Sequence, residues 1–273
     1  MKKHLTLATF TAILCSCGAK NLDALKPNEN APKFFHNGDA LSSLTENSSF
    51  EEATRSVEGK EIVSRIASGE SLFLLWHQAG CSHCEILRDV FVPFVKNTQA
   101  LVYSFNGAHL LSGIADIEEA YPSIAEGFPS PATPYLFYLG AKEKTATKID
   151  LTGKTTDLYD FTETMYQYMD FQPTYTFRSL SRFESFCTSK KVMAYVEDQA
   201  SYGSLVSSTL QEARKDSKKE FAILDYEYLT DTEKASFQQK YGTPASSLMD
   251  FSNEKGPTLI SSGQEEIIRN YFN

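Results

Sequence analysis

The feature that most constrains the fold of this chain is a Cys-x-x-Cys pair placed directly after a run of apolar residues. The run Leu72-Phe73-Leu74-Leu75-Trp76 has the length and composition of a buried strand. Residues 85–91 carry apolar side chains at three- and four-residue intervals, which predicts a helix after the pair. Cys81 and Cys84 therefore fall at a strand-to-helix turn, where cysteines at this spacing can close a small disulfide ring.

The predicted helix changes the chemistry of the first cysteine. Exposed amide hydrogens and the helix dipole favour negative charge at a helix N-terminus, so the Cys81 thiol should ionise more readily than a free cysteine. His83 lies between the two cysteines, close enough to donate a hydrogen bond or to place a positive charge near the Cys81 sulfur. Both effects stabilise the reduced form, and a pair whose reduced form is stabilised is a comparatively strong oxidant of other thiols.

A strand, a Cys-x-x-Cys pair and a helix in this order resemble the active-site region of the thioredoxin fold, and the His-Cys ending is similar to that of bacterial envelope disulfide-forming oxidants. A second mark of that family lies downstream, where Thr133-Pro134 precedes the apolar, aromatic residues 135–138. In the family a cis-proline at this place faces the dithiol, whereas Pro134 taken alone would be interpreted as a trans turn proline. The separation from Cys81, 134 − 81 = 53 residues, leaves room for a helix, a strand and another helix.

The chain also departs from the family pattern. Many thioredoxin-like enzymes place a buried acid six residues before the first cysteine, where it moves protons, but Leu75 occupies that position here. His77 and His83 are candidates for this task, although a histidine near a site is as often only a hydrogen-bonded neighbour. Gly80 precedes Cys81 where thioredoxins proper usually have tryptophan, which argues against a housekeeping thioredoxin.

Residues 1–17 have the pattern of an export signal. Two lysines are followed by an apolar segment, residues 5–14, which is too short to span a bilayer as a helix. The sequence Leu14-Cys15-Ser16-Cys17 resembles a bacterial lipobox, in which a cysteine is lipidated and becomes the mature N-terminus. Cys17 fits this role better than Cys15 because a small residue precedes it. A plain secretory signal cleaved nearby is the alternative.

This assignment changes the cysteine count of the exported protein. Of the 5 cysteines, one leaves with the signal and Cys17 takes the lipid, so Cys81, Cys84 and Cys187 remain. The first two can pair in an oxidising exterior, and Cys187 is expected to be a buried single thiol. Zinc is an alternative use of the pair with His83, but a structural zinc site needs four ligands and His83 lies too close in sequence to both cysteines. We therefore expect neither a metal nor a cofactor.

Composition restricts the remaining function classes. With 273 residues and 41% apolar content, the chain can form two ordinary domains with their own cores. A net charge of −9 and a pI near 5.1 argue against a nucleic-acid partner. Negative charge would also hold the protein off an anionic membrane surface, so the lipid is the expected anchor.

The distribution of polar and apolar residues predicts five segments. Residues 18–56 are polar and are expected to form a flexible tether, with the alternative that Phe34-Phe35 mark a short edge strand on the first domain. The fold class predicted for the remainder is α/β. The segments are the signal and lipobox at 1–17, the tether at 18–56, a thioredoxin-like three-layer redox domain at 57–172, a linker at 173–190, and a degenerate thioredoxin-like α/β domain without Cys-x-x-Cys at 191–273.

The second domain is expected to lack redox chemistry. When the two domains are aligned by sequence, Ser201-Tyr202-Gly203-Ser204 stands where residues 81–84 stand in the first domain. Pro257 then precedes a strand at a separation of 257 − 201 = 56 residues, against 53 in the first domain. Hydroxyl groups in place of sulfurs cannot exchange disulfides, and the resemblance implies a domain that binds substrates or partners. The alternative is an unrelated α/β cap.

Together these features predict an extracytoplasmic thiol-disulfide oxidoreductase, anchored to the bacterial cell membrane through Cys17. Cys81 would exchange with protein thiol or disulfide substrates and Cys84 would resolve the mixed disulfide, while Thr133 and Pro134 offer backbone edges to the substrate chain. A membrane redox partner would recycle the pair. The influence of His83 on the Cys81 sulfur favours oxidation or isomerisation of substrates, whereas a membrane electron donor would make the site a reductase. The alternative function is a surface binding or transport-accessory lipoprotein in which the cysteine pair is only a structural clip.

Overall fold

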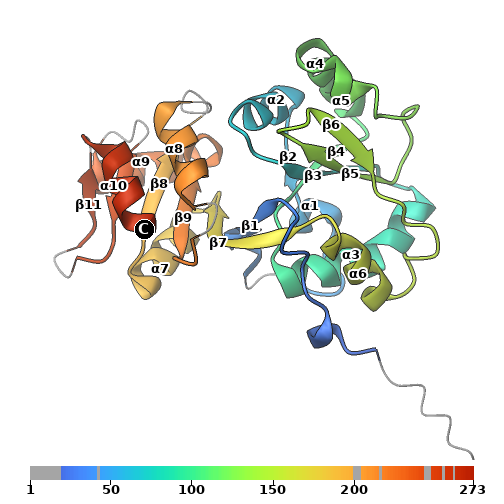
Figure 1. The fold of residues 1–273 in the computed structure, drawn as a ribbon, viewed down its shortest axis with the longest axis horizontal. Helices are drawn as coiled ribbons and strands as arrows, with labels where there is room; N and C mark the ends of the chain where they lie inside the picture. Colours follow the sequence, from blue (N-terminus) through green and yellow to red (C-terminus); the bar gives the residue numbers. More distant parts are fainter. Residues whose placement is uncertain are drawn as a thin grey trace, which may run out of the picture.

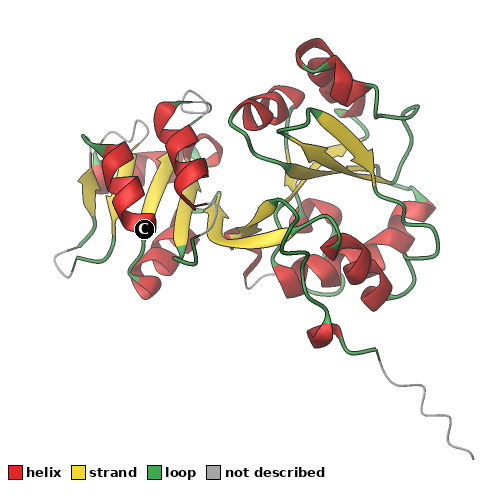
Figure 2. Cartoon of the chain, viewed as in Figure 1, coloured by secondary structure: helices red, strands yellow, loops and turns green. Residues whose placement is uncertain are grey.

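The computed structural model describes residues 20–41, 44–198, 204–214, 217–242, 247–253, 256–260 and 262–273. These residues form two α/β domains, one at the right and one at the left of Figure 1, each built around a sheet with helices against it (Figures 1 and 2). The predicted α/β class is confirmed. The expected signal and lipobox, with Cys17, lie outside the described residues. Among the helices that are described, none combines the length and the apolar character needed to cross a membrane.

The first domain has the strand order of the thioredoxin fold, β2-β4-β3-β5-β6. Strands β2, β4 and β3 are parallel, and β5 and β6 form an antiparallel hairpin beside β3. The strands are β2 (Arg55–Ser56), β3 (Leu72–His77), β4 (Val102–Asn106), β5 (Tyr135–Gly140) and β6 (Thr145–Lys148). The helices are α1 (Phe50–Ala53), α2 (Gly59–Ala67), α3 (Ser82–Thr98), α4 (Leu110–Ala120), α5 (Pro122–Ala125) and α6 (Leu158–Tyr166).

Strand β3 is buried on both faces, which explains why its sequence is continuously apolar rather than alternating. Successive side chains of a strand point to opposite faces. Phe73 and Leu75 pack in the cluster that contains α3 and α6, whereas Leu74 and Trp76 pack in the cluster that contains α2 and α4. The domain is therefore a three-layer structure, in which β3 is followed directly by the turn that leads into α3.

The second domain repeats this plan, with strand order β7-β9-β8-β10-β11 and the same parallel and antiparallel pairs. The strands are β7 (Asp170–Phe177), β8 (Met193–Glu197), β9 (Phe221–Asp225), β10 (Ser247–Asp250) and β11 (Thr258–Ile260). The helices are α7 (Leu180–Lys190), α8 (Leu205–Arg214), α9 (Asp231–Tyr241) and α10 (Gln264–Phe272). Short 3₁₀ turns are η1 (Leu22–Ala24), η2 (Gly38–Leu41) and η4 (Tyr226–Tyr228).

The predicted linker at 173–190 is wrong, because these residues form most of β7 and all of α7. The second domain therefore begins near Asp170. Polar residues on the buried face of β7 explain the error: Thr174 and Thr176 are 1% and 3% exposed although neither is apolar. The aromatic residues Phe171, Tyr175 and Phe177 repeat with the period of a strand and were the available sequence signal.

The predicted tether is also wrong for its described part. Phe34, Phe35 and Phe50 are buried, and β1 (Lys33–Asn37) joins the second sheet in parallel with β7. The Phe34 ring stacks on Phe73 of the first domain with the ring centroids 4.5 Å apart. Each buried phenylalanine contributes about 1.5–3 kcal/mol, enough to fix a mostly polar segment in place. The edge-strand alternative was right about the strand and about its packing on the first domain, but the sheet that β1 extends is the second one.

The alignment of Pro257 with Pro134 is wrong. Pro257 precedes β11, the second strand of the hairpin, whereas Pro134 precedes β5, the first strand of its hairpin. The residues directly before β10 lie outside the described ranges, as do Ser201 to Gly203. The second domain also contains the hairpin β10-β11, for which the sequence alignment left no room.

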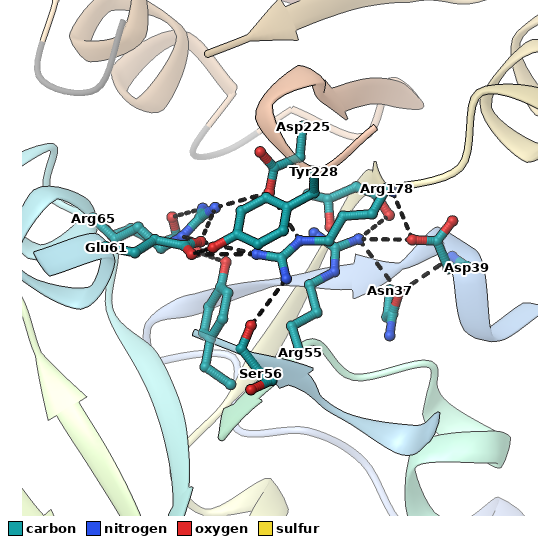
Figure 3. A network of polar contacts seen from close by, with 12 residues as sticks. Asn37, Asp39, Arg55, Ser56, Glu61, Arg65, Arg178, Asp225 and Tyr228 are labelled. Atoms are coloured by element: carbon teal, nitrogen blue, oxygen red, sulfur yellow. Dashed lines mark hydrogen bonds and ion pairs between the residues drawn. The ribbon is translucent and has the colours of Figure 1, made fainter. Parts of the chain in front are cut away.

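A buried network of charged side chains joins the two domains (Figure 3). Arg178, which follows β7, donates hydrogen bonds to Asp225 at 3.0 Å, to Glu61 of α2 at 3.0 Å, and to the carbonyl oxygen of Ser56 at 3.1 Å. Arg65 of α2 donates to Glu61 at 2.8 Å and forms an ion pair with Asp225 at 3.4 Å. Charges of both domains are thus paired with each other across the interface.

Candidate functional site

Cys81 is placed by the turn between β3 and α3. The strand ends at His77, and Cys81 is the N-cap of α3, with its sulfur accepting a hydrogen bond from the Cys84 amide at 3.2 Å. Gly80 adopts a positive φ of 73°, a conformation that favours glycine over any residue with a side chain. The sequence therefore bends at Gly80 and presents the Cys81 sulfur at a helix N-terminus, where negative charge is stabilised.

The two cysteines form a disulfide with Cα atoms 5.2 Å apart, but their environments differ. Cys84 is 2% exposed and packs in the apolar cluster with Leu87 and Phe91 of the same helix. Cys81 is only partly buried. An incoming sulfur can therefore reach Cys81 but not Cys84, which divides the pair into an outer and an inner sulfur.

Thr133 and Pro134 lie beside the disulfide although they are far away in sequence. The Thr133–Pro134 peptide bond is cis, and the Thr133 carbonyl oxygen is 3.5 Å from the Cys81 sulfur. The antiparallel pairing of β5 with β3, in which Tyr135 is the partner of Trp76, brings this loop to the end of β3. Both side chains are partly exposed. The structure therefore brings together the two motifs that the sequence placed 53 residues apart.

His83 lies in the first turn of α3 and is exposed. Within the described part of the chain, the Cys81 sulfur accepts a hydrogen bond from the Cys84 amide and lies 3.5 Å from the Thr133 carbonyl oxygen, and neither contact involves the His83 ring. The influence of His83 on the Cys81 sulfur therefore stays a prediction.

His77 has the opposite environment, because it is 2% exposed at the end of β3. Its Nδ1 atom lies 3.7 Å from a carboxylate oxygen of Glu51, and its ring packs against Phe50 with the centroids 5.3 Å apart. The Nε2 atom has no hydrogen-bond partner within the described residues. Burial lowers the pKa of His77, and the Glu51 carboxylate opposes this shift. Sequence reasoning could not supply Phe50 and Glu51 as neighbours, because they belong to the segment expected to be a tether.

The surface around the outer sulfur is open. Residues 78–80 are exposed on one side, and Pro131 and Ala132 are exposed on the other. Ile86, two residues after Cys84 on α3, is 47% exposed, which is unusual for a large apolar side chain. An extended polypeptide could therefore approach Cys81 without displacing any described element.

Cys187 takes no part in this site. It lies on α7 of the second domain, is fully buried, and forms no disulfide with any cysteine that the structure describes. Burial raises the pKa of the Cys187 thiol far above its usual range, so it remains protonated and unreactive. Across the described residues, no group of three or more His, Cys, Asp or Glu side chains is arranged to hold a metal ion.

No protein-family model and no curated protein matches the chain. Solved structures that resemble it include two crystal structures of ERdj5, at 15% and 12% identity with TM-scores of 0.31 and 0.32, and zinc-bound human ERp44, at 10% identity with a TM-score of 0.27. These alignments cover 79%, 81% and 80% of this chain but only 28%, 32% and 58% of those chains. The chain thus spans no more than about a third of the ERdj5 chains. Likenesses this weak carry no functional conclusion.

Proposed function

We propose that the protein is an extracytoplasmic thiol-disulfide oxidoreductase that exchanges disulfides with protein substrates through Cys81 and Cys84. The observation that carries this proposal is the unequal exposure of the two sulfurs at a strand-to-helix turn, with the outer one beside the Thr133–Pro134 backbone. A disulfide that served only as a structural clip would gain nothing from an accessible sulfur.

The exchange follows from this geometry. In the oxidising direction, a substrate thiolate attacks the Cys81 sulfur and the Cys81–Cys84 bond breaks, so that its electron pair leaves on the Cys84 sulfur. A second thiolate of the substrate then attacks the substrate sulfur of the mixed disulfide. The Cys81 sulfur leaves as a thiolate, which the N-terminus of α3 stabilises. The substrate gains a disulfide, and the protein is left with two reduced cysteines.

Substrate binding is proposed at Thr133 and Pro134. The loop lies beside the reactive sulfur, and the exposed apolar surface of Ile86 offers a second contact for an unfolded chain. We assign to His83 a role in setting the reduction potential of the Cys81–Cys84 pair. A positive charge in the first helical turn would stabilise the Cys81 thiolate further and favour oxidation or isomerisation over reduction.

The proposed anchor is a lipid on Cys17, and the packing of the N-terminal segment limits how far the domains can stand from it. Lys20 pairs with Asp157 and Asp160 at the start of α6. Lys20 stands 20 − 17 = 3 positions after Cys17, and an extended chain of that length reaches at most about 11 Å. The redox domain would therefore work close to the membrane, within reach of a membrane redox partner that recycles the pair.

Trapping tests the function directly. A Cys84→Ser variant lacks the thiol that attacks a mixed disulfide from within the protein, so adducts formed when the Cys81 thiolate attacks a substrate disulfide should accumulate in cells, visible on non-reducing gels. A Cys81→Ser, Cys84→Ser double variant should form none, and Cys187→Ser should behave like the wild type. If the Cys84→Ser variant forms no adducts, the binding-lipoprotein alternative gains support. The reduction potential tests the direction, since a value near about −270 mV, the range of thioredoxin, would contradict the oxidant assignment.

A further inference from the structure

We propose that His77 is the group that takes up and returns the proton of the Cys84 thiol during exchange. This inference rests on the proposed function, because it concerns the inner sulfur of the same site. The position where the thioredoxin resemblance would place a buried acid is Leu75, which cannot carry a proton.

Cys84 needs such a partner because of where it lies. Its side chain is 2% exposed and is surrounded by apolar side chains, including Leu87. Apolar surroundings disfavour the charged thiolate, which is nevertheless the form that attacks a disulfide. Bulk water has little access to this sulfur, so a nearby protein group has to accept the proton.

The strand geometry directs His77 toward the layer that holds Cys84. Alternate residues of β3 share a face, and Phe73 and Leu75 belong to the same apolar cluster as Cys84. His77 is two residues beyond Leu75 and is the last residue of β3, at the end from which the chain turns to Cys81. Its ring contacts Phe50 of α1, which in turn packs edge-on against Phe91 of α3.

The protonation state and the hydrogen bonding of the His77 ring suit a proton acceptor. A hydrogen on Nδ1, the atom that faces Glu51 at 3.7 Å, would leave Nε2 with a free lone pair. Nε2 has no partner within the described residues, and leaving a buried nitrogen without a hydrogen bond destabilises the fold, which a functional role would explain. Burial lowers the pKa of His77, so the ring is neutral at neutral pH.

The charged neighbours of the ring are few. Glu51 faces it from α1 and is the charged group that acts on its pKa, β4 presents the neutral Asn106 as the paired residue, and the proposal adds the reduced cysteine pair at the start of α3. A shift in the titration of His77 therefore has two sources, Glu51 and the cysteine pair.

The proposed step is balanced in protons and electrons. When Cys81 carries a mixed disulfide, the Cys84 thiol gives its proton to Nε2 of His77, and the Cys84 thiolate attacks the Cys81 sulfur. The Cys81–Cys84 bond forms, the bond from Cys81 to the substrate breaks, and the substrate sulfur leaves with the electron pair. The proton then passes from His77 to that sulfur or to water. The oxidising direction runs through the same steps in reverse.

Reaction of the reduced protein with the aromatic disulfide DTNB separates the two sulfurs. The first equivalent of coloured thiolate reports attack by Cys81, and the second reports attack by Cys84 on the mixed disulfide. The full chain would carry serine at Cys15 and Cys17, so that neither contributes colour. His77→Gln is the test variant, and His109→Gln, an exposed histidine at the start of α4, is the matched control.

We expect His77→Gln to slow the second phase at neutral pH on the order of 100-fold and to move its rise toward higher pH, with the first phase unchanged. The His109→Gln control should match the parent in both phases. A second phase with the parent pH profile would overturn the proposal, and so would an equal loss in both phases, which would indicate a structural role.

A measurement on the parent protein protects the test against a variant that does not fold. The pKa of His77, followed by nitrogen NMR, should differ between the oxidised and the dithiol forms, because only the dithiol presents a proton to the ring. Equal titration in both forms would overturn the proposal. Neither measurement uses a physiological substrate, so both remain decisive if cellular trapping through Cys84→Ser fails.

Discussion

The two domains share a strand order but use the same edge of the sheet in opposite ways. In the first domain β3 and β4 end at the paired residues His77 and Asn106, and the exposed residues 78–80 lead from this edge to Cys81. In the second domain β8 and β9 end at the paired residues Glu197 and Asp225, which are 8% and 1% exposed. One edge is open for chemistry, and the other is buried.

The buried edge is covered by the first domain. Asp225 pairs with Arg65 of α2, and the charges of Arg65 and Glu70, both in the first domain, act on Glu197. A domain that docks through its strand ends cannot offer that edge to a substrate without separating from its neighbour. At the strand ends where the first domain presents Cys81, the second domain presents buried carboxyl groups that interact with charges of the first domain.

The difference between the two domains is tested most directly by looking for disulfide exchange that does not depend on the first domain. We expect Cys81→Ser to reduce disulfide formation in reduced ribonuclease below detection, because no other described cysteine is accessible. Cys187→Ser should retain the wild-type rate per folded molecule. Residual exchange in the Cys81→Ser variant at more than a small fraction of the wild-type rate would show that the second domain is not redox-inactive.

The next largest effect is expected at the interface. Arg178→Ala leaves Glu61 and Asp225 with one partner fewer in a buried site, and removing one partner from such a network costs about 3–5 kcal/mol. Urea unfolding would measure this loss. Trp76, the 1 tryptophan of the chain, reports on the first domain, and circular dichroism reports on both, so the variant should also separate the two transitions.

Lys240→Ala is the matched control for the interface. It removes an ion pair with Glu184 whose lysine is 54% exposed, and a surface pair of this kind contributes about 1 kcal/mol or less. If Arg178→Ala destabilises the protein no more than this control does, the charged network does not hold the domains together.

A smaller effect should appear in the pH dependence of stability. Burial raises the pKa of Glu197 to about 8, so the folded protein keeps a proton there that the unfolded chain has already lost. Stability should therefore fall as pH rises toward the folded pKa, by about 2 kcal/mol between about pH 6.5 and pH 8. Starting at pH 6.5 leaves out most of the contribution of His36, whose pKa burial lowers to about 4.

Glu197→Gln identifies the group responsible. The amide has no proton to lose, so its stability curve should be flat over the same pH window when urea midpoints are compared. If the variant keeps the wild-type slope of stability against pH, another group causes the pH dependence, and Glu197 does not carry a buried proton at the interface.

The parts of the fold that were predictable are those with a strong local pattern. The apolar run of β3, the turn at the cysteines and the helix that follows them are each specified by residues close together in sequence. The predicted cis-proline motif needed the family resemblance, since nothing local distinguishes Pro134 from a turn proline. These elements bring Cys81, Cys84, Thr133 and Pro134 together in the structure, and the roles of these residues stay proposals.

The parts that were missed depend on contacts between distant residues. β1 is fixed by pairing with β7 and by the stacking of Phe34 on Phe73, none of which is visible in a polar N-terminal stretch. Arg65 and Asp225 have the sequence appearance of surface residues, but both are buried and form an ion pair between the two domains. His77 could be named as a candidate from sequence, but its burial and its unpartnered nitrogen required the structure.

The smallest expected effect separates backbone strain from function at Gly80. Its φ is 73°, and beyond its chain neighbours no heavy atom lies within 4 Å of the place that a Cβ would take. Gly80→Ala therefore adds only the cost of the left-handed conformation, about 1 kcal/mol. Gly263 has a φ of 65° and equally open surroundings in the second domain, so Gly263→Ala should cost a similar amount in urea unfolding. Only Gly80→Ala should also change the rate at which Cys81 reacts with DTNB, because only that turn aims a reactive sulfur. Equal reactivity of Cys81 in both variants would show that the turn at Gly80 tolerates a side chain without moving the sulfur.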